Sequence, residues 1–304
     1  MPGVWPLRRL GKIEAPAEIQ IVAAEPFGYR NRVQLHVEGA RIGYREGRSH
    51  RLCETGVCPV ASPRIEEVLR SLREMARDSK WPRFVRSVEI FTDEEHVQLN
   101  VLETERPVAR RFFDWAATRI PQMVEGALDY AGCFRVSSNS FFQVNRFLLD
   151  RLVETALEGA AGETALDLYA GAGLMSLPMA QRFRTVTAVE SGSGAVRDLQ
   201  FNAERAGLSN LTALQETAEE FLARLESRPD FVLLDPPRSG IGKAVVQRIA
   251  ELKPRLVTIV ACDPATLARD LAGLVAAGYR IERMALVDLF PQTFHLETVV
   301  GLVG

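Results

Sequence analysis

The feature that most constrains this fold is an alternation of short apolar runs with longer helical patterns in the second half of the chain. Five runs resemble buried strands: TALDLYA, TVTAVE, LTALQ, DFVLLD and RLVTIVAC. Helical patterns lie between or after them, at residues 174–183, 194–206, 218–226, 243–252 and 264–277. Continuous apolar strands separated by helices are typical of a parallel sheet with helices on both faces. The pattern predicts a Rossmann-like, doubly wound α/β domain.

Residues 1–130 follow a different pattern. They contain short strand-like runs at residues 32–37, 85–91 and 97–102, one helical stretch at residues 63–78, and frequent glycine and proline. This mixture predicts a smaller α+β domain over residues 1–130 and the α/β domain over residues 131–304. A chain of 304 residues is long enough for two domains of ordinary size.

Composition excludes several classes of protein. No run of 18 apolar residues is present that could cross a membrane, and residues 1–16 lack the apolar stretch of a secretory signal. Four cysteines in so long a chain do not form a disulfide framework, which favours a reducing, cytoplasmic setting. The formal net charge of −2 gives no global sign of a nucleic acid partner.

One segment does carry excess positive charge. Residues 28–51 contain six arginines against two glutamates, and Tyr29, His36, Tyr44 and His50 are interleaved with them. Cations beside aromatic rings suit a phosphate backbone with a stacked base. A solvated two-stranded ribbon would show the same composition, so both interpretations stay open.

The first strand of the α/β domain continues into a glycine-rich turn, DLYAGAG, at residues 167–173. Glycines there would let the backbone approach a ligand at a helix N-terminus. Glu190 ends the next strand, where a carboxylate can accept hydrogen bonds from ribose hydroxyls. The third glycine of the dinucleotide fingerprint is missing. S-adenosylmethionine, which has ribose and adenine but no pyrophosphate, therefore fits better than a nicotinamide cofactor; a tight turn without a ligand is the alternative.

Three further residues at strand ends have chemistry of their own. Asp235 begins the stiff loop DPPR after the fourth strand. Cys262 follows the fifth strand beside a helix N-terminus, where the helix dipole would stabilise a thiolate. Glu297 opens the last apolar strand, where partial burial would raise the pKa of its carboxyl towards neutrality. The plainer alternatives are a rigid turn, a small buried thiol and an exposed carboxylate.

Taken together, five motifs closely resemble the RNA 5-methyluridine methyltransferase family in order and spacing. They are SFFQVN at residues 140–145, DLYAGAG, LLDPPRSG, ACDPATLARD and DLFPQTFHLE. The resemblance extends from about residue 26 to the end of the chain. It implies a methyltransferase sheet, S-adenosylmethionine as cofactor, RNA as partner and methylation of uracil C5. It also implies site residues: Cys262 as nucleophile, Glu297 as proton acceptor, and Gln143, Tyr169, Gly171, Glu190 and Asp235 at the cofactor.

The sequence departs from the family in several places. Asp263 follows the cysteine where the family usually has Asn, and Leu174 replaces a polar residue common near the cofactor. We find no counterpart of the N-terminal β-barrel RNA-binding domain of many relatives. Many relatives also hold an iron–sulfur cluster on four cysteines upstream of residue 28. Here Cys53 and Cys58 come after that point, and two thiols cannot hold a cubane, so we expect no cluster.

Other functions remain as alternatives. One is methylation of another position, either an exocyclic amine or cytosine C5. Arg238 stands where amine methyltransferases carry a stacking aromatic residue, which counts against the amine. The other is a non-catalytic RNA-binding protein that retains the fold. The sequence does not distinguish tRNA from 23S-type rRNA as substrate; we expect no membrane and no DNA partner.

Overall fold

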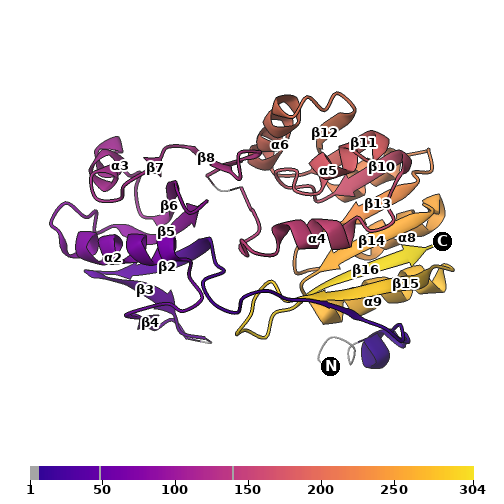
Figure 1. The fold of residues 1–304 in the computed structure, drawn as a ribbon, viewed down its shortest axis with the longest axis horizontal. Coiled ribbons are helices and arrows are strands. Elements are labelled where there is room, and N and C mark those ends of the chain that lie inside the picture. Colours follow the sequence, from indigo (N-terminus) through magenta and orange to yellow (C-terminus); the bar gives the residue numbers. More distant parts are fainter. Residues whose placement is uncertain (1–6, 48, 139) are drawn as a thin grey trace. The chain divides into compact units, whose positions relative to one another are not determined.

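The structure is a computed structural model that describes residues 7–47, 49–138 and 140–304 (Figure 1). The chain divides into two compact units. The larger unit contains the described residues up to Ala24, together with Ser140–Phe142 and Phe147–Gly304. The smaller unit contains the described residues from Glu25 to residue 138 and the segment Gln143–Arg146.

An eight-stranded sheet forms the centre of the larger unit, in the order β1-β15-β16-β14-β13-β10-β11-β12. The strands are β1 (Gln20–Val22), β10 (Gly162–Leu168), β11 (Phe183–Glu190), β12 (Leu211–Gln215), β13 (Phe231–Leu234), β14 (Leu256–Ala261), β15 (Arg280–Val287) and β16 (Glu297–Val303). Strands β10 to β14 are parallel, whereas β16 is antiparallel to both of its neighbours.

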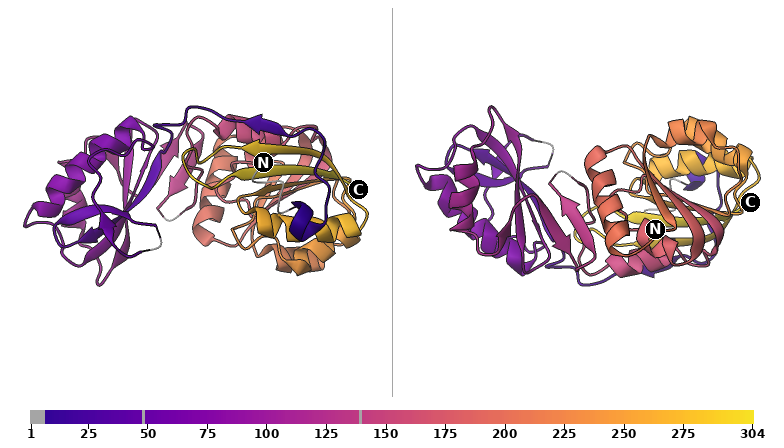
Figure 2. Two further views of the ribbon diagram at one scale, coloured as in Figure 1. Left: turned by 90° about the horizontal axis from the view of Figure 1, so that it is seen from below. Right: turned by 90° about the horizontal axis from the view of Figure 1, so that it is seen from above.

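Helices cover both faces of this sheet, as Figure 2 shows. They are η1 (Leu7–Gly11), α4 (Leu149–Ala156), α5 (Ser176–Ala180), α6 (Ser193–Arg205), α7 (Ala218–Arg224), α8 (Lys243–Leu252) and α9 (Pro264–Ala276). The predicted doubly wound α/β fold is confirmed.

Strand β13 shows why the apolar runs of this region are unbroken. Phe231 and Leu233 belong to a buried cluster with residues of α4 and α5, whereas Val232 and Leu234 belong to a cluster with residues of α7, α8 and α9. Successive side chains of a strand point to opposite faces of its sheet. Because both faces are covered, every residue of β13 is buried, and no polar alternation appears in the sequence.

The first described residues also belong to the larger unit. Strand β1 pairs in parallel with β15, and η1 lies against α9. From the sequence, these residues were predicted to belong to an N-terminal domain that ends at residue 130. A three-residue strand is too short to show a pattern, so its pairing with β15, far along the chain, could not be anticipated.

The smaller unit is built on a six-stranded sheet in the order β4-β3-β2-β5-β6-β7 and a separate hairpin of β8 with β9. Its strands are β2 (Arg32–Glu38), β3 (Arg41–Arg45), β4 (Leu52–Cys53), β5 (Val85–Thr92), β6 (Val97–Thr104), β7 (Met123–Val124), β8 (Ala127–Tyr130) and β9 (Phe134–Ser137). Its helices are α2 (Pro63–Arg77) and α3 (Arg110–Ala117).

Helix α2 supplies much of the core of the smaller unit. It begins after Ser62, whose hydroxyl accepts a hydrogen bond from the amide of Ile65, and Pro63 occupies its first turn. Its apolar stripe includes Ile65, Leu69 and Leu72, which pack in one buried cluster with residues of β2 and β5.

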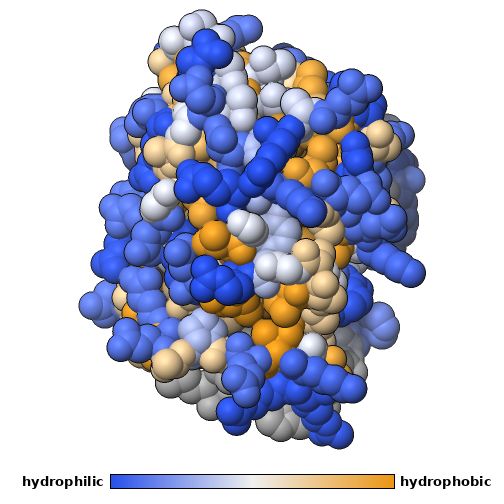
Figure 3. Space-filling view, turned by 90° about the vertical axis from the view of Figure 1, so that its right-hand side faces the viewer, coloured by the Kyte–Doolittle hydropathy of each residue, from blue (hydrophilic) through white to orange (hydrophobic). Residues whose placement is uncertain are grey.

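None of the described helices is long and apolar enough to cross a membrane. Figure 3 shows one face of the molecule, where hydrophilic side chains cover most of the surface and apolar ones form smaller patches between them. Scattered apolar residues of this kind are ordinary for a protein surface in water.

Candidate active site

The topology of the larger sheet brings five of the predicted site residues to one edge. Strands β10, β11, β13 and β14 are parallel, so Tyr169, Glu190, Asp235 and Cys262 lie at or just beyond the carboxyl ends of neighbouring strands. Strand β16 is antiparallel to β14, so its first residue, Glu297, lies at the same edge.

The register between β14 and β16 sets the spacing of two of these residues. Ala261, the residue before Cys262, is paired with Thr298, the residue after Glu297. The two site residues therefore flank a directly opposed pair, which brings them near each other. The negative charge of Glu297 contributes to the raised pKa of the Cys262 thiol.

At the other end of the edge, Glu190 is held by two backbone amides. Its Oε2 accepts a hydrogen bond from the amide of Gly171 at 3.0 Å, and its Oε1 accepts one from the amide of Gly192 at 2.6 Å. Tyr169 has a left-handed backbone with φ of 66°, and its hydroxyl donates to the carbonyl of Ile241 at 3.4 Å. The glycine-rich turn is therefore fixed against the carboxylate that follows the next strand.

A buried carboxylate lies beneath this turn. Asp167 is 1% exposed and accepts a hydrogen bond from the hydroxyl of Ser176 at the start of α5. Burial raises the pKa of Asp167 to about 7, with the negative charges of Asp235 and Glu190 acting in the same direction. Asp167 thus connects β10 to the first helical turn after the glycines.

The loop after β13 is clamped to α9. Asp270, which is buried, accepts a hydrogen bond from the amide of Ile241 at 2.8 Å, and Arg269 donates to the carbonyl of Ser239 at 3.0 Å. Arg269 and Asp270 also form an ion pair. Gly240 has a φ of 80°, and a Cβ there would lie 2.5 Å from both of these side chains. In the sequence, Arg269 and Asp270 belong to the motif ACDPATLARD, and nothing in that motif predicts this contact.

Burial dominates the electrostatics beside Cys262. Glu297 is 4% exposed, and burial together with the charge of Asp235 raises the pKa of its carboxyl to about 8. Burial also raises the pKa of Asp235 to about 7. The positive charge of Arg238 lowers the pKa of both Glu297 and Cys262, although by less than burial raises them. Arg238 lies 3.5 Å from His295, Nη2 to Nε2.

Comparison with known proteins now decides the family. Residues 123–303 match the family model described as tRNA (Uracil-5-)-methyltransferase. The chain belongs to this family. An uncharacterized RNA methyltransferase of Gloeobacter violaceus is 33% identical over 348 residues, with 96% of this chain and 74% of the relative covered. The 23S rRNA (uracil(1939)-C(5))-methyltransferase RlmD of Halomonas elongata is 33% identical, with 95% and 68% covered.

A solved structure agrees with this family assignment. It is the crystal structure of Pyrococcus abyssi tRNA (uracil-54, C5)-methyltransferase in complex with S-adenosyl-L-homocysteine. It matches with a TM-score of 0.77 and 26% identity, and the match covers 99% of this chain and 82% of that one. The present chain is therefore an RNA uracil-C5 methyltransferase that uses S-adenosylmethionine, as its resemblance to the family in five motifs predicted.

The residues around the glycine-rich turn fit the methyl donor of the family. Each oxygen of the Glu190 carboxylate accepts one backbone amide, which leaves further lone pairs for hydroxyl donors. Leu174, where relatives often have a polar residue, is partly buried and offers only apolar contact. Among the described residues, no group of three or more His, Cys, Asp or Glu side chains could hold a metal ion.

One expectation about Cys262 changes. The helix dipole was expected to favour the thiolate, but burial raises the pKa of the Cys262 thiol. The neighbouring Asp263 caps α9, its carboxylate accepting hydrogen bonds from the amides of Ala265 and Thr266 at 2.9 and 2.8 Å. An Asn at this position could make the same cap.

Gln143 does not belong to the larger unit. It is buried within the segment Gln143–Arg146 of the smaller one. Its place at the cofactor stays a prediction.

Within the described residues, the basic segment at residues 28–51 does not present the unpaired cations and stacking rings that its composition suggested. Tyr29 is completely buried and cannot stack on a base. Four of the arginines are paired with carboxylates: Arg32 with Glu89, Arg41 with Glu54, Arg45 with Glu38 and Arg51 with Glu46. Arg48 lies outside the described residues. The ribbon interpretation, left open by the sequence, describes most of this segment.

Proposed function

We propose that this enzyme methylates C5 of a uridine in tRNA or 23S-type rRNA by covalent catalysis, with Cys262 as the nucleophile and Glu297 as the base. The observation that carries the proposal is the proximity of the two groups: Cys262 and Glu297 flank the paired residues Ala261 and Thr298, and the charge of Glu297 acts on the Cys262 thiol. A soft nucleophile and a carboxylate side by side are what addition and elimination at a uracil ring require.

The chemistry begins with the thiolate of Cys262. Its sulfur bonds to C6 of uracil, and the electrons of the C5–C6 double bond move to form an enolate through C5, C4 and O4. The positive charge of Arg238 acts on both Cys262 and Glu297, and it is suited to stabilise this negative charge. C5 is thereby converted from a poor nucleophile into one that can take a methyl group.

The second half of the reaction belongs to Glu297. Its carboxylate removes the proton from C5, the electrons of that C–H bond restore the C5–C6 double bond, and the bond from C6 to sulfur breaks. Because burial raises the pKa of Glu297 to about 8, the protonated product of this step is stable near neutral pH. The thiolate of Cys262 is released for the next turnover.

Tyr169, Gly171, Glu190 and Asp235 would hold S-adenosylmethionine, with Gln143 added by resemblance to the family. When bound, this cofactor supplies an electrophilic methyl group on a sulfonium. Glu190 is positioned by two amides to accept hydrogen bonds from ribose, and the left-handed turn exposes its backbone to the ligand.

The proposed substrate is an RNA, either tRNA or 23S-type rRNA. Two of the relatives compared above act, by their names, on 23S rRNA and on tRNA respectively. In either case the target base has to leave its stack to reach a thiol at the edge of the sheet. We further propose RNA rather than DNA as the substrate. We also propose a cytoplasmic setting, because the four cysteines form no disulfide.

The decisive experiment measures tritium release from RNA transcribed with 5-tritiated uridine, using tRNA and a 23S rRNA fragment in parallel. Release from one RNA that needs S-adenosylmethionine and is lost in Cys262→Ala is the expected result. The same RNAs made with 5-tritiated cytidine are the control for cytosine methylation. Cofactor binding without release from either uridine RNA would contradict the proposal.

A further inference from the structure

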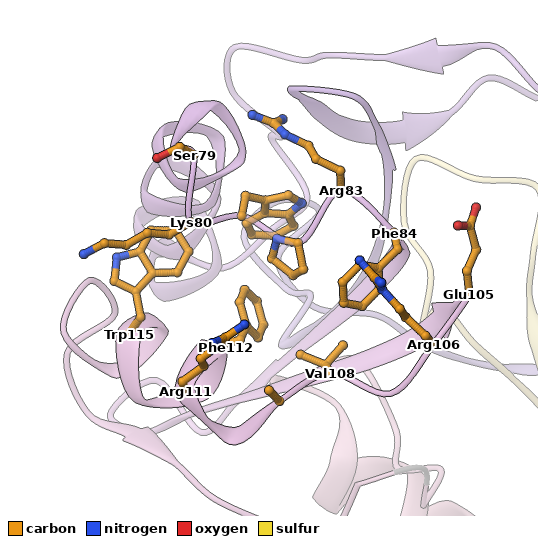
Figure 4. A pocket seen from close by; sticks show the side chains of 13 residues that line it. Ser79, Lys80, Arg83, Phe84, Glu105, Arg106, Val108, Arg111, Phe112 and Trp115 are labelled. Carbon is orange, nitrogen blue, oxygen red and sulfur yellow. The ribbon is translucent and has the colours of Figure 1, made fainter.

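The smaller unit contains a cavity that the reaction does not use. Its volume is about 820 Å³, within the range of roughly 300–1,000 Å³ typical of small-molecule sites. The turn Ser79–Phe84 after α2 and the segment from Glu105 to Trp115, which includes the start of α3, line it. Figure 4 shows the side chains of these two segments around the cavity.

Aromatic rings form the interior of this cavity. Trp81 and Phe112 are buried and meet edge to face, with ring centroids 5.5 Å apart. Trp115 lies beside Phe112 with a centroid separation of 6.1 Å, and it is partly exposed, as is Phe84. Partly exposed rings above a fixed aromatic base are platforms on which a nucleobase can stack.

Cations surround these rings. Lys80, Arg83, Arg106 and Arg111 are all exposed, and the one acidic residue among the described lining residues, Glu105, is already bonded to Arg86.

Two of the four cations are held in place. Arg83 donates to the carbonyls of Gly39 and Ala76, both at 2.9 Å, and the guanidinium of Arg106 lies 4.2 Å from the ring centre of Phe84. Lys80 and Arg111 form no ion pair within the described ranges.

The pairing of charges distinguishes this cavity from the basic segment at residues 28–51. In that segment, four arginines are paired with nearby carboxylates. In the cavity the positive charge is uncompensated and lies next to exposed rings. An acidic protein partner would use the cations but would leave the stacking surfaces of Phe84 and Trp115 unused. A nucleotide uses both, because its phosphate pairs with cations and its base stacks on rings or on a guanidinium plane.

We propose that this cavity binds a single-stranded nucleotide of the substrate RNA, other than the uridine that is methylated. The inference rests on the proposed function in one respect, namely that RNA is the substrate. The base would stack against Trp115 or the Arg106–Phe84 pair, and the phosphate would lie at Lys80 and Arg111. The cavity then contributes to affinity for RNA and takes no part in the chemical step.

The test compares the double variant Lys80→Glu/Arg111→Glu with Arg70→Glu, a charge reversal on an exposed position of α2 outside the cavity. Binding of the substrate RNA to the full chain is measured without S-adenosylmethionine, over a range of salt concentrations. We expect the double variant to bind RNA at least about tenfold more weakly, with the salt slope reduced by roughly two. Arg70→Glu should stay within about twofold of the wild type.

Stacking is tested separately from charge. Trp115→Ala should weaken RNA binding severalfold, and Trp115→Phe should restore most of it, because base–aromatic stacking is worth about 1–3 kcal/mol per base. Saturating RNA should return kcat to near the wild-type value in every cavity variant, while binding of S-adenosylmethionine is unchanged.

Equal RNA affinity in the wild type, the double variant and Trp115→Ala would overturn the inference and leave a protein partner as the better occupant. Since binding is measured directly, this result is distinct from a failure of methyl transfer. A different result would contradict the proposed function alone. In that case the wild-type enzyme would release no tritium, while the double variant would still bind RNA more weakly than the wild type.

Discussion

The carboxyl edge of the larger sheet and the cavity of the smaller unit differ in charge and in exposure: the first has buried acidic side chains, and the second has exposed basic ones. At the edge, Asp235 and Glu297 are carboxylates whose pKa is raised by burial, beside a thiol whose pKa is raised as well. At the cavity, Lys80 and Arg111 are exposed cations next to rings that are partly open to solvent.

The difference in burial suits the two regions to different tasks, namely proton transfer in catalysis and binding of RNA phosphates. A buried carboxylate is costly to ionise and therefore exchanges a proton near neutral pH, which a base in catalysis must do. Exposed cations stay charged at all ordinary pH values and attract phosphate from a distance. We therefore expect the two regions to respond independently to substitution and to pH.

The largest expected effect comes from Cys262→Ala. Without the sulfur, no covalent adduct can form at C6, and tritium release should fall by at least about a thousandfold. RNA affinity should stay within about twofold of the wild type, because the cavity is untouched. Tritium release is measured at saturating RNA, and RNA affinity by filter binding. Residual release above one percent of the wild-type rate would remove Cys262 from its assigned role.

Glu297→Gln should break the reaction at a later point. The thiolate can still add and C5 can still be methylated, but the C5 proton has no acceptor, so the adduct persists. We expect turnover to fall by roughly 10²–10⁴-fold and a covalent RNA–protein complex to accumulate on a denaturing gel. Absence of the complex in Cys262→Ala/Glu297→Gln is the matched control. Normal turnover by the single variant would show that another group accepts the proton.

The pH dependence of kcat and of RNA binding should differ between the two regions. The pKa of Glu297 is about 8, so the carboxyl is mostly protonated at pH 6 and cannot act as a base. The raised pKa of Cys262 acts in the same direction. We expect kcat to rise by at least about tenfold per pH unit between pH 6 and 7 and to go on rising above pH 8, where the Cys262 thiol still loses its proton, while the Kd for RNA changes by less than twofold. A kcat that is flat between pH 6 and 8 would argue against Glu297 as the base.

Much of the larger unit was predictable because burial on both faces of a strand leaves a pattern in the strand's own sequence. Strands buried on both faces leave unbroken apolar runs, and Tyr169, Glu190, Asp235 and Cys262 could be placed at strand ends without knowing how the strands pair. The proximity of Cys262 to Glu297 was not predictable in this way. It depends on the antiparallel insertion of β16 between β14 and β15, which an apolar run such as VVGLV does not reveal.

Charge was the least predictable property of the smaller unit. Counting residues 28–51 gave a basic excess, but Glu54 and Glu89, which pair with Arg41 and Arg32, lie outside that window and reach it across the sheet. The cavity showed the converse. Its cations come from two segments about 25 residues apart, and neither segment has a motif. Whether a cation is free is decided by tertiary neighbours, which composition does not report.

The smallest expected effect tests the clamp between the loop after β13 and α9. Gly240 and Gly242 both have a positive φ, of 80° and 87°, so a Cβ strains the backbone at either position. At Gly242 nothing lies within 4 Å of that Cβ, whereas at Gly240 it would meet Arg269 and Asp270 at 2.5 Å. The effect of Gly242→Ala therefore comes from backbone strain alone. The effect of Gly240→Ala comes from the same strain and from displacement of Arg269 and Asp270.

We expect Gly240→Ala to lower kcat severalfold more than Gly242→Ala, because the displaced loop begins at Asp235 and also holds Arg238. RNA affinity should be the same in both variants, since the loop belongs to the larger unit. Thermal unfolding and steady-state kinetics measured on both variants distinguish lost stability from lost positioning. Equal kcat values would mean that the Arg269–Asp270 clamp supports the fold without positioning the reacting groups.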